Sequence, residues 1–421
     1  PSRSATLGTT SSPRAVVRES NEAPSTDESA AASDGWSRPS RASAIRDASN
    51  RMTPTGTVVG VADDRIHLIV LFGGQSAEHE VSCVTATHVL AAADPARYRI
   101  TPVGISTDGS WALAAGAAEA LSAGRALPER LDAAGDEVSP SSVLSPAEAT
   151  NARTVVLPLL HGPMGEDGTV QGMLELADVA YVGSGVLGSA LAMDKAMAKQ
   201  VLAAAGVAQA RHRAFADRHI TPGLPSEIAD ELGLPCFVKP ANLGSSVGVT
   251  KARTVEEVRD AIERAASYDE WIVAEEAIVG REIEIAVLGD PGDPFVSVPG
   301  EIVPGDEFYS YHDKYVNDAS QGLVPAPLTP EQTEEGRALA AHVFRLLRCD
   351  GLARCDFFFE DPADGGRGFL CNEVNTMPGF TPISMFPKML IASGMTYPEI
   401  IDRLIDLALA RHARRRRNTE H

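Results

Sequence analysis

Four polar side chains occupy matching places on two neighbouring strands that the sequence predicts late in the chain. Arg354 and Asp356 lie in the run CDGLARCDFFFE, and Glu373 and Asn375 lie in the run FLCNEVNTM. Side chains two residues apart point to the same face of a strand, and the intervening DPADGG is typical of a turn, so the strands should pair antiparallel. One face of this hairpin therefore presents a cation, two carboxylates and an amide.

The hairpin alone leaves two interpretations open. Its apolar neighbours indicate that the polar cluster is shielded from water; they are Leu352, Phe357, Phe358, Phe359, Leu370 and Val374. Buried charges persist only when they are paired or bound to a metal. Two carboxylates and an amide oxygen are hard ligands, which suit Mg²⁺ and the phosphates of a nucleotide rather than zinc. The alternative is a structural network of an arginine with carboxylates, which proteins also bury.

The composition of the 421-residue chain, with 44% hydrophobic residues, indicates a globular protein of about two to four domains. The formal net charge of -20 argues against a nucleic-acid partner, whose binding surface would be basic. A local exception is the run RHARRRR at residues 411–417, for which a solvated tail is the simpler interpretation. The five cysteines show no CxxC spacing, which is typical of reduced cysteines in a cytoplasmic protein.

Residues 1–64 differ from the rest of the chain, because they are rich in Ser, Ala, Arg, Asp and Thr and lack apolar periodicity. This composition predicts a disordered extension. It has no apolar segment of the kind found in secretory signals, and its acidic residues argue against a transit peptide. No later run approaches the roughly 20 apolar residues that span a bilayer, so we expect no membrane partner.

The hydrophobic pattern predicts α/β and α+β structure in three domains. A strand at residues 66–72, a glycine turn and a helix open an α/β domain at 65–192, with an irregular surface region at about 112–150. The runs CFVKP, WIVAEE and REIEIAVLG, with a helix at 255–266, predict a central α+β domain at 193–290. A C-terminal domain follows at 291–411, and the basic tail occupies 412–421.

A lysine beside a loop of small residues suits phosphate binding. Lys239 ends the CFVKP strand and precedes the loop ANLGSSVG, whose backbone N–H groups can approach phosphate oxygens. The segment is not a Walker A motif, and an ordinary turn with a solvated lysine would look similar. Residues 275–282, EEAIVGRE, could present carboxylates to an adenine and a ribose. Taken by itself, that segment is better interpreted as a solvated acidic connection.

Two further segments carry groups that could bind substrate. The loop GDEFYSYHDKYVNDASQ, residues 305–321, concentrates Tyr, His and Lys as mobile lids over active sites do, although a surface Ω-loop is equally compatible. The run GGQSAEHEVS, residues 73–82, places acids at the start of a helix, where the helix dipole alone would favour them. A glutamate there can also hold a substrate ammonium group.

Taken in order, these segments closely resemble the D-alanine:D-alanine ligase family of the ATP-grasp superfamily. The resemblance covers about residues 66–409 and rests on eight motifs, namely GGQSAEHEVS, LHGPMGEDGTVQG, MDKAMAK, VKPANLGSSVGV, EEAIVGREIE, YHDKY, ARCDFFF and NEVNTMPGFTPISMFP. It implies a three-domain ATP-grasp architecture that ligates two D-alanines with ATP through an acyl phosphate, for peptidoglycan precursors. It also implies two Mg²⁺ or Mn²⁺ ions and a homodimer.

The resemblance implies a role for each matching residue. The nucleotide-binding residues would be Lys195, Lys239, Ser246 and Lys314 at the phosphates, Glu275 and Ile278 at adenine, and Glu282 at ribose. The metal ligands would be Asp356, Glu373 and Asn375. The substrate residues would be Glu80 and His161 for the first D-alanine, and Ser384 and Met385 for the second.

The catalytic residues implied by the same resemblance are Glu80, Ser245, Tyr315, Arg354 and Gly379. Ser245 and Tyr315 would link the glycine-serine loop to the lid together with Glu80, while Arg354 and the Gly379 N–H would stabilise an oxyanion. The Lys314-Tyr315 pair favours an amine over a hydroxyl nucleophile. Two alternatives remain: a related ligase for another D-amino or D-hydroxy acid pair, and a nucleotide-binding protein without catalysis.

Overall fold

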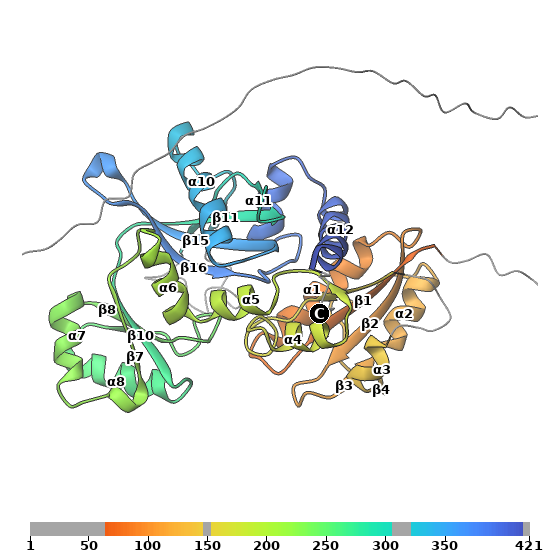
Figure 1. Cartoon of the computed structure of the whole chain (residues 1–421), viewed down its shortest axis with the longest axis horizontal. Helices are drawn as coiled ribbons and strands as arrows, with labels where there is room; N and C mark the ends of the chain where they lie inside the picture. The colour runs from red at the N-terminus through yellow and green to blue at the C-terminus, as the bar shows by residue number, and fades with distance from the viewer. Residues whose placement is uncertain (1–63, 146–152, 305–320, 416–421) are drawn as a thin grey trace, which may run out of the picture. The chain divides into compact units, whose positions relative to one another are not determined.

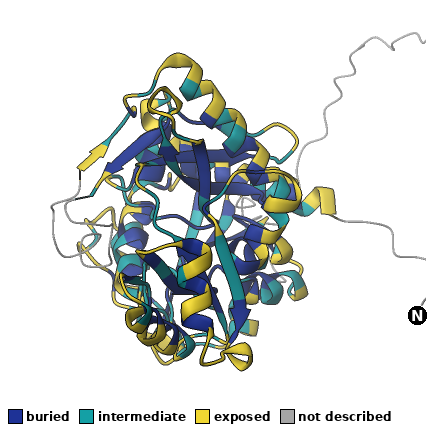
Figure 2. Ribbon diagram, turned by 90° about the vertical axis from the view of Figure 1, so that its left-hand side faces the viewer, coloured by how far each residue is buried: buried dark blue, intermediate teal, exposed yellow. Residues whose placement is uncertain are grey.

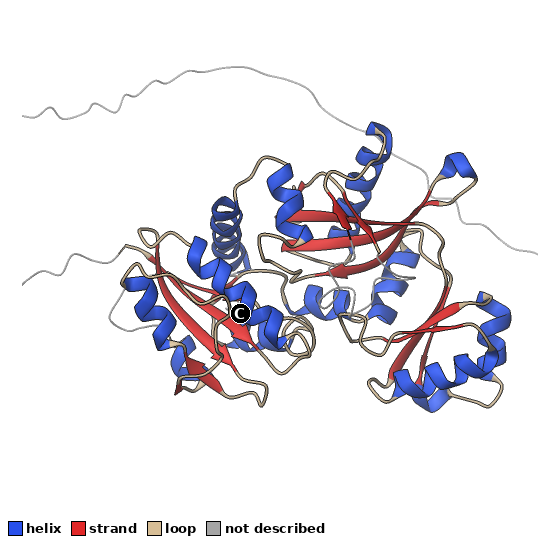
Figure 3. Ribbon diagram, turned by 180° about the vertical axis from the view of Figure 1, so that it is seen from behind, coloured by secondary structure: helices blue, strands red, loops and turns tan. Residues whose placement is uncertain are grey.

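The structure is a computed structural model, and it describes residues 64–145, 153–304 and 321–415. The described residues belong to one compact unit, Val61–His421. Within them the strands form three sheets, each flanked by helices (Figure 3). The predicted extension, except for residue 64, the loop at 305–320 and the last residues of the basic tail lie outside the described residues.

The first sheet has the strand order β4-β3-β2-β1-β5-β6. Its strands are β1 (Ile66–Gly73), β2 (Tyr98–Ile105), β3 (Trp111–Leu113), β4 (Asp136–Glu137), β5 (Thr154–Pro158) and β6 (Ala180–Tyr181). Its helices are α1 (His79–Ala92), α2 (Ala115–Ser122), α3 (Pro140–Leu144) and α4 (Thr169–Leu176). The apolar strand β1 pairs parallel with both β2 and β5 and is almost entirely buried, as expected for a strand covered on both faces. The predicted strand-turn-helix opening is confirmed.

The prediction of an irregular region at about 112–150 was wrong for four short elements within it. β3 and β4 extend the edge of the first sheet, and α2 and α3 follow them. Alanine has the highest intrinsic helix propensity, so the alanine-rich run forms α2 although only one of its residues is buried. The weak pattern reflects short elements at a sheet edge rather than a lack of structure.

The second sheet has the strand order β7-β10-β8-β9. Its strands are β7 (His212–Ala216), β8 (Cys236–Pro240), β9 (Thr250–Ala252) and β10 (Trp271–Glu276), and its helices are α7 (Leu224–Leu232) and α8 (Val255–Ala266). α8 begins as predicted, because the Thr254 hydroxyl caps it by accepting a hydrogen bond from the Glu257 N–H at 3.2 Å. α7 and α8 lie beside one another against this sheet (Figure 1).

The third sheet contains the predicted hairpin that carries Arg354, Asp356, Glu373 and Asn375. Its order is β14-β13-β11-β15-β16, with β12 paired to β11. Its strands are β11 (Arg281–Gly289), β12 (Phe295–Val296), β13 (Gly300–Val303), β14 (Gln321–Leu323), β15 (Gly351–Glu360) and β16 (Gly368–Asn375), and its helices are α10 (Pro330–Leu346), α11 (Met385–Ala392) and α12 (Tyr397–Arg415). The sequence grouped β11 with β10, but β11 pairs with β13 and β15 instead. The chain therefore crosses between two sheets at residues 277–280.

Two helices, α5 (Val186–Met193) and α6 (Lys195–Ala204), connect the first sheet to the second. Figure 2 shows buried strands inside the unit and exposed residues on the outer faces of the helices. In the part of the chain that the structure describes, we find no helix with the length and apolar character needed to cross a bilayer.

Replacement of a buried aromatic residue tests the packing of α10 on the third sheet. Phe344 is fully buried in the cluster that includes residues of β11 and β15. We expect Phe344→Ala to lower the free energy of unfolding by about 3–5 kcal/mol, because it leaves a cavity in a closely packed core. Urea unfolding measures this, and His342→Ala, an exposed position on the same helix, is the matched control. A loss below about 1 kcal/mol for Phe344→Ala would contradict the packing described here.

Candidate functional site

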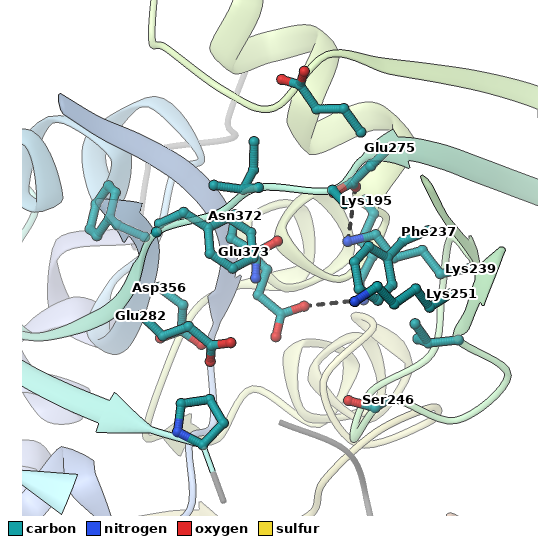
Figure 4. Close-up of a pocket in the computed structure, with 18 of the residues that line it drawn as sticks. Lys195, Phe237, Lys239, Ser246, Lys251, Glu275, Glu282, Asp356, Asn372 and Glu373 are labelled. Atoms are coloured by element: carbon teal, nitrogen blue, oxygen red, sulfur yellow. Dashed lines mark ion pairs between the residues drawn. The ribbon is translucent and has the colours of Figure 1, made fainter. Parts of the chain in front are cut away.

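A cavity of about 350 Å³ lies where the second and third sheets face each other. One wall is basic and carries Lys195, Lys239 and Lys251, while the opposite wall carries the carboxylates of Asp356 and Glu373 (Figure 4). Apolar side chains line the part of the cavity near the crossing segment, among them Phe237, Ile278 and Val249. The cavity thus offers an apolar region next to two walls of opposite charge.

The predicted hairpin forms one edge of this site. β15 pairs antiparallel with β16, and Arg354 lies opposite Asn375 while Asp356 lies opposite Glu373. The pairing confirms that the four polar residues share one face of the sheet. Asp356 is buried, and a shift in register just after it interrupts the regular pairing.

Arg354 is held by carboxylates of its own sheet. Its Nε and Nη2 donate to the two carboxylate oxygens of Asp356, each at 2.8 Å, and Glu284 lies 3.4 Å from Nε. Burial alone would lower the pKa of Arg354, but the charges of Asp356 and Glu284 outweigh it and hold that pKa well above its usual range. Arg354 therefore remains a cation whose position is fixed at the cavity wall.

The basic wall contains a buried lysine that the sequence analysis missed. Lys199 follows Lys195 by one helical turn on α6, and its Nζ lies 3.1 Å from Glu275 Oε1. Lys239 Nζ lies 2.9 Å from the same oxygen. Burial alone would raise the pKa of Glu275, but the two ammonium groups outweigh it and lower that pKa to about 2. The spacing of Lys199 from Lys195 in MDKAMAK, four residues apart on one helical face, was the available signal.

The loop after Lys239 has an unusual backbone conformation. Ser245 and Ser246 adopt left-handed backbone angles, with φ of 50° and 60°, which are uncommon for residues other than glycine. Lys195 Nζ donates to the Leu243 carbonyl at 2.7 Å and lies 3.5 Å from Glu373 Oε2. One lysine therefore connects this loop to the carboxylate wall.

Ser245 meets Glu78, not Glu80. The Ser245 hydroxyl donates to the Glu78 carboxylate, whereas Glu80 pairs with Arg130 and its side chain is 64% exposed. α1 begins at His79, and two positions along a helix are about 200° apart around its axis, so the two glutamates face different directions. The predicted link between Glu80 and Ser245 was wrong by two residues.

The segment after β16 holds the other predicted substrate residues. Ser384 Oγ lies 2.8 Å from Thr381 Oγ1 and accepts a hydrogen bond from the Thr381 N–H at 3.2 Å, while Met385 is buried at the start of α11. Within the described residues the Gly379 N–H donates to no protein acceptor. The role of the Gly379 N–H as an oxyanion donor stays a prediction.

The loop between β5 and α4 reaches the same segment. His161 Nδ1 lies 2.9 Å from the Met377 carbonyl oxygen, and Glu166 Oε1 accepts a hydrogen bond from the Met377 N–H at 3.1 Å. Glu166 was missed, although it lies in the motif LHGPMGEDG between glycines. Burial, with the charge of Glu78 second, raises the pKa of Glu166 to about 8. Tyr315 and Lys314 lie outside the described residues.

The donors on the hairpin suit a hard cation. Asp356, Glu373 and Asn375 supply only oxygen ligands from adjoining strands. Among the described residues no group of three or more His, Cys, Asp or Glu side chains could hold a metal ion by itself. Two carboxylates and an amide fit an ion such as Mg²⁺, which usually completes its coordination with phosphate oxygens and water.

Comparisons with known proteins agree over most of the described chain. A family model described as the D-ala D-ala ligase N-terminus matches residues 67–184, and one described as the D-ala D-ala ligase C-terminus matches residues 201–406. A D-alanine-D-alanine ligase of Bacillus pumilus is 44% identical over 354 residues, which are 83% of this chain and 97% of that relative.

Two solved structures give the same result for the fold. The D-alanine-D-alanine ligase from Coxiella burnetii is 35% identical, with a TM-score of 0.68 over 83% of this chain and 96% of that one. The VanG D-Ala:D-Ser ligase from Enterococcus faecalis is 33% identical, with a TM-score of 0.69 over 82% of this chain and 99% of that one. The fold is therefore ATP-grasp.

The shared carboxylate of Glu275 makes a pH-dependent contribution to stability. Because its pKa is lowered from 4.5 to about 2, the contribution is fully present above pH 4.5 and is lost as the pH falls toward 2. At pH 7 we expect Glu275→Gln to lower the free energy of unfolding by about 3–5 kcal/mol, because two buried ammonium groups lose their counter-charge.

Urea unfolding at pH 7 and near pH 3 measures this effect. The difference between Glu275→Gln and the wild type should shrink at the lower pH. Glu334→Gln is the control, because the Glu334 side chain is 69% exposed and pairs only across one helical turn with Arg337. An equal difference at both pH values would show that the contribution of Glu275 to stability does not depend on its charge.

Proposed function

The chain belongs to the D-alanine-D-alanine ligase family, and we propose that it joins two D-alanine molecules with ATP to form D-alanyl-D-alanine, ADP and phosphate. The product would serve peptidoglycan precursor synthesis. One observation carries this proposal. Lysines, the carboxylates of the β15–β16 hairpin and the glycine-serine loop at residues 244–246 all line the same cavity. A nucleotide-binding protein without catalysis would not need Arg354 at the wall of that cavity.

We infer one orientation for the nucleotide in the cavity. Adenine lies against the apolar region at Ile278, with Glu275 at its polar edge, and Glu282 accepts hydrogen bonds from the ribose hydroxyls. The phosphates extend toward Lys195, Lys239 and the backbone near Ser246. Because Lys199 offsets the charge of Glu275, Lys239 keeps a net positive charge to offer the phosphates.

The first step activates a carboxylate. A carboxylate oxygen of the first D-alanine attacks the γ-phosphorus of ATP. The bond between the γ-phosphorus and the β,γ-bridging oxygen breaks, which yields an acyl phosphate and ADP. Glu78 holds the ammonium group of this D-alanine, in place of the predicted Glu80, since it lies beside Ser245 and near Glu166. The neighbouring carboxyl groups of Glu78 and Glu166 favour a cationic group of the ligand over an anionic one.

The second step forms the peptide bond. The neutral amine of the second D-alanine attacks the acyl carbon, and phosphate leaves from the tetrahedral intermediate as the nitrogen loses its proton. Arg354 and the Gly379 N–H stabilise the developing oxyanion, because they are fixed donors at the position where negative charge appears. Ser384 and the backbone of Met385 hold the carboxylate of this D-alanine.

Divalent metal ions such as Mg²⁺ would be held by Asp356, Glu373 and Asn375, and they supply positive charge that offsets the phosphate oxygens during phosphoryl transfer. At Asp356 such an ion would share the carboxylate with Arg354, which donates to both of its oxygens. The oxygen-only donor set selects a hard ion over zinc or copper.

The choice of second substrate has one competing candidate. A solved relative at 33% identity is described as a D-Ala:D-Ser ligase, so D-serine is the alternative nucleophile. The Lys314-Tyr315 pair, the homodimer and the cytoplasmic location remain predictions. Sedimentation velocity measures the oligomeric state directly.

An assay of the second substrate tests the function. Purified protein with ATP, Mg²⁺ and D-alanine should release phosphate and form D-alanyl-D-alanine, and D-serine or D-lactate added with D-alanine should contribute little product at neutral pH. Mixed dipeptide or depsipeptide as the main product would assign the chain to the alternative. Absence of any phosphate release would refute the ligase activity.

Removal of the oxyanion arginine tests the second step. We expect Arg354→Ala to lower kcat by roughly 100-fold or more, the scale for loss of one oxyanion donor. Arg213→Ala is the control, because Arg213 forms partly exposed ion pairs with Glu227 and Glu231 on α7. Steady-state kinetics at saturating substrates measures both, and a near-normal kcat for Arg354→Ala would remove this residue from the mechanism.

A further inference from the structure

The backbone N–H and C=O groups of one residue near the proposed oxyanion site are both bound by side chains from the first domain. The Met377 N–H donates to Glu166 Oε1 at 3.1 Å, and the Met377 carbonyl oxygen lies 2.9 Å from His161 Nδ1. Glu166 and His161 belong to the loop that follows β5 of the first sheet, whereas Met377 follows β16 of the third. The loop after β5 therefore binds both the donor and the acceptor of the Met377 backbone.

The second carboxylate oxygen of Glu166 binds the backbone of its own loop. Glu166 Oε2 accepts a hydrogen bond from the Gly162 N–H at 3.0 Å, so one carboxylate spans its own loop and the Met377 backbone. Glu166 and His161 are 8% and 4% exposed. In addition, Gln171 Nε2 donates to the Gly165 carbonyl at 2.8 Å, which ties the loop to α4.

The turn after Met377 is held at its far end as well. The Tyr397 hydroxyl donates to the Phe380 carbonyl at 2.6 Å, and Ser384 accepts a hydrogen bond from the Thr381 N–H. Gly379, between these anchors, has an N–H that no described protein group accepts. The direction of that N–H is therefore set by the anchors on either side of it.

We propose that Glu166, together with His161, is a positioning residue for the oxyanion donor: by holding the Met377 backbone, it sets the direction of the Gly379 N–H. The role rests on the proposed function, since an oxyanion arises only in ligation. It also couples the site of the first D-alanine to that of the second, because Gly162, which donates to Glu166, adjoins the Glu78 carboxylate. A Cβ atom added at Gly162 would lie 3.3 Å from Glu78 Oε2.

The chemistry of the contact explains why a carboxylate is needed. Both oxygens of Glu166 accept from backbone N–H groups, so an amide at this position would turn an NH₂ group toward one of them. Loss of one partner in a buried site leaves an unsatisfied donor. The Met377 segment would then shift, and a misplacement of about 1 Å in a reacting group can lower a rate by roughly 100-fold.

The experiment compares two isosteric variants on one loop. Glu166→Gln should lower kcat by roughly 10- to 100-fold while the KM for ATP changes less than about twofold. A phosphinate dipeptide that mimics the tetrahedral intermediate should lose affinity by the same factor as kcat/KM. A residue with only a structural role would not produce this separation.

Asp167→Asn is the matched control. Asp167 accepts hydrogen bonds from the Met164 N–H of its own loop at 2.8 Å and from the Thr169 N–H at the start of α4 at 2.9 Å. Neither bond involves Met377. Its kcat and its affinity for the phosphinate should stay within about twofold of the wild type. If Glu166→Gln does not fold, Glu166→Asp, which keeps the carboxyl group but is one methylene shorter, should show the same loss.

Three results would overturn the proposal. They are a wild-type kcat and phosphinate affinity in the folded Glu166 variant, an effect confined to the KM for the first D-alanine, and an equal loss in Asp167→Asn. In each case the wild type still forms dipeptide, so the ligase function stands. An inactive wild-type protein would instead refute the proposed function itself.

Discussion

The sharing of one buried carboxylate by two lysines is the interaction on which the nucleotide site depends. Glu275 forms ion pairs with Lys199 at 3.1 Å and with Lys239 at 2.9 Å. One carboxylate faces two ammonium groups, so the basic wall keeps a net positive charge and neither buried ammonium group lacks a counter-charge. Across the cavity, Asp356 and Glu284 surround Arg354 and leave an excess of negative charge. A phosphate chain with divalent cations is complementary to both walls, because it presents anions to one and cations to the other.

The backbone between the sheets places these walls opposite each other. β10 ends beside the lysine wall and β11 begins within the carboxylate sheet, so residues 277–280 both connect the sheets and form the apolar end of the cavity. Contacts from the first sheet complete the site from the other side, through Glu78 at the Ser245 loop and through Glu166 and His161 at Met377. The proposed sites of the first D-alanine and of the oxyanion are thus linked through buried side chains that bind short backbone segments.

Residues with a strict local pattern could be predicted from the sequence. The alternation of Arg354 and Asp356, and of Glu373 and Asn375, predicted their shared face, and the structure pairs them across adjacent strands. The register of α1 could not be read in the same way: Glu78 and Glu80 both follow the glycine turn, and only the start of the helix at His79 decides which one meets Ser245. Glu166 and Lys199 were missed because their partners are distant in sequence. The pairing of β11 with β15 likewise depends on a segment some 70 residues later.

The central claim is that this cavity activates a carboxylate by phosphorylation before the peptide bond forms. The most direct measurement uses D-alanine labelled with ¹⁸O in its carboxylate, together with unlabelled ATP, and detects the label in the released phosphate by mass spectrometry or ³¹P NMR. The mechanism predicts one ¹⁸O atom in each phosphate formed with dipeptide, because the attacking carboxylate oxygen leaves with the phosphorus. Unlabelled phosphate accompanying dipeptide would contradict it.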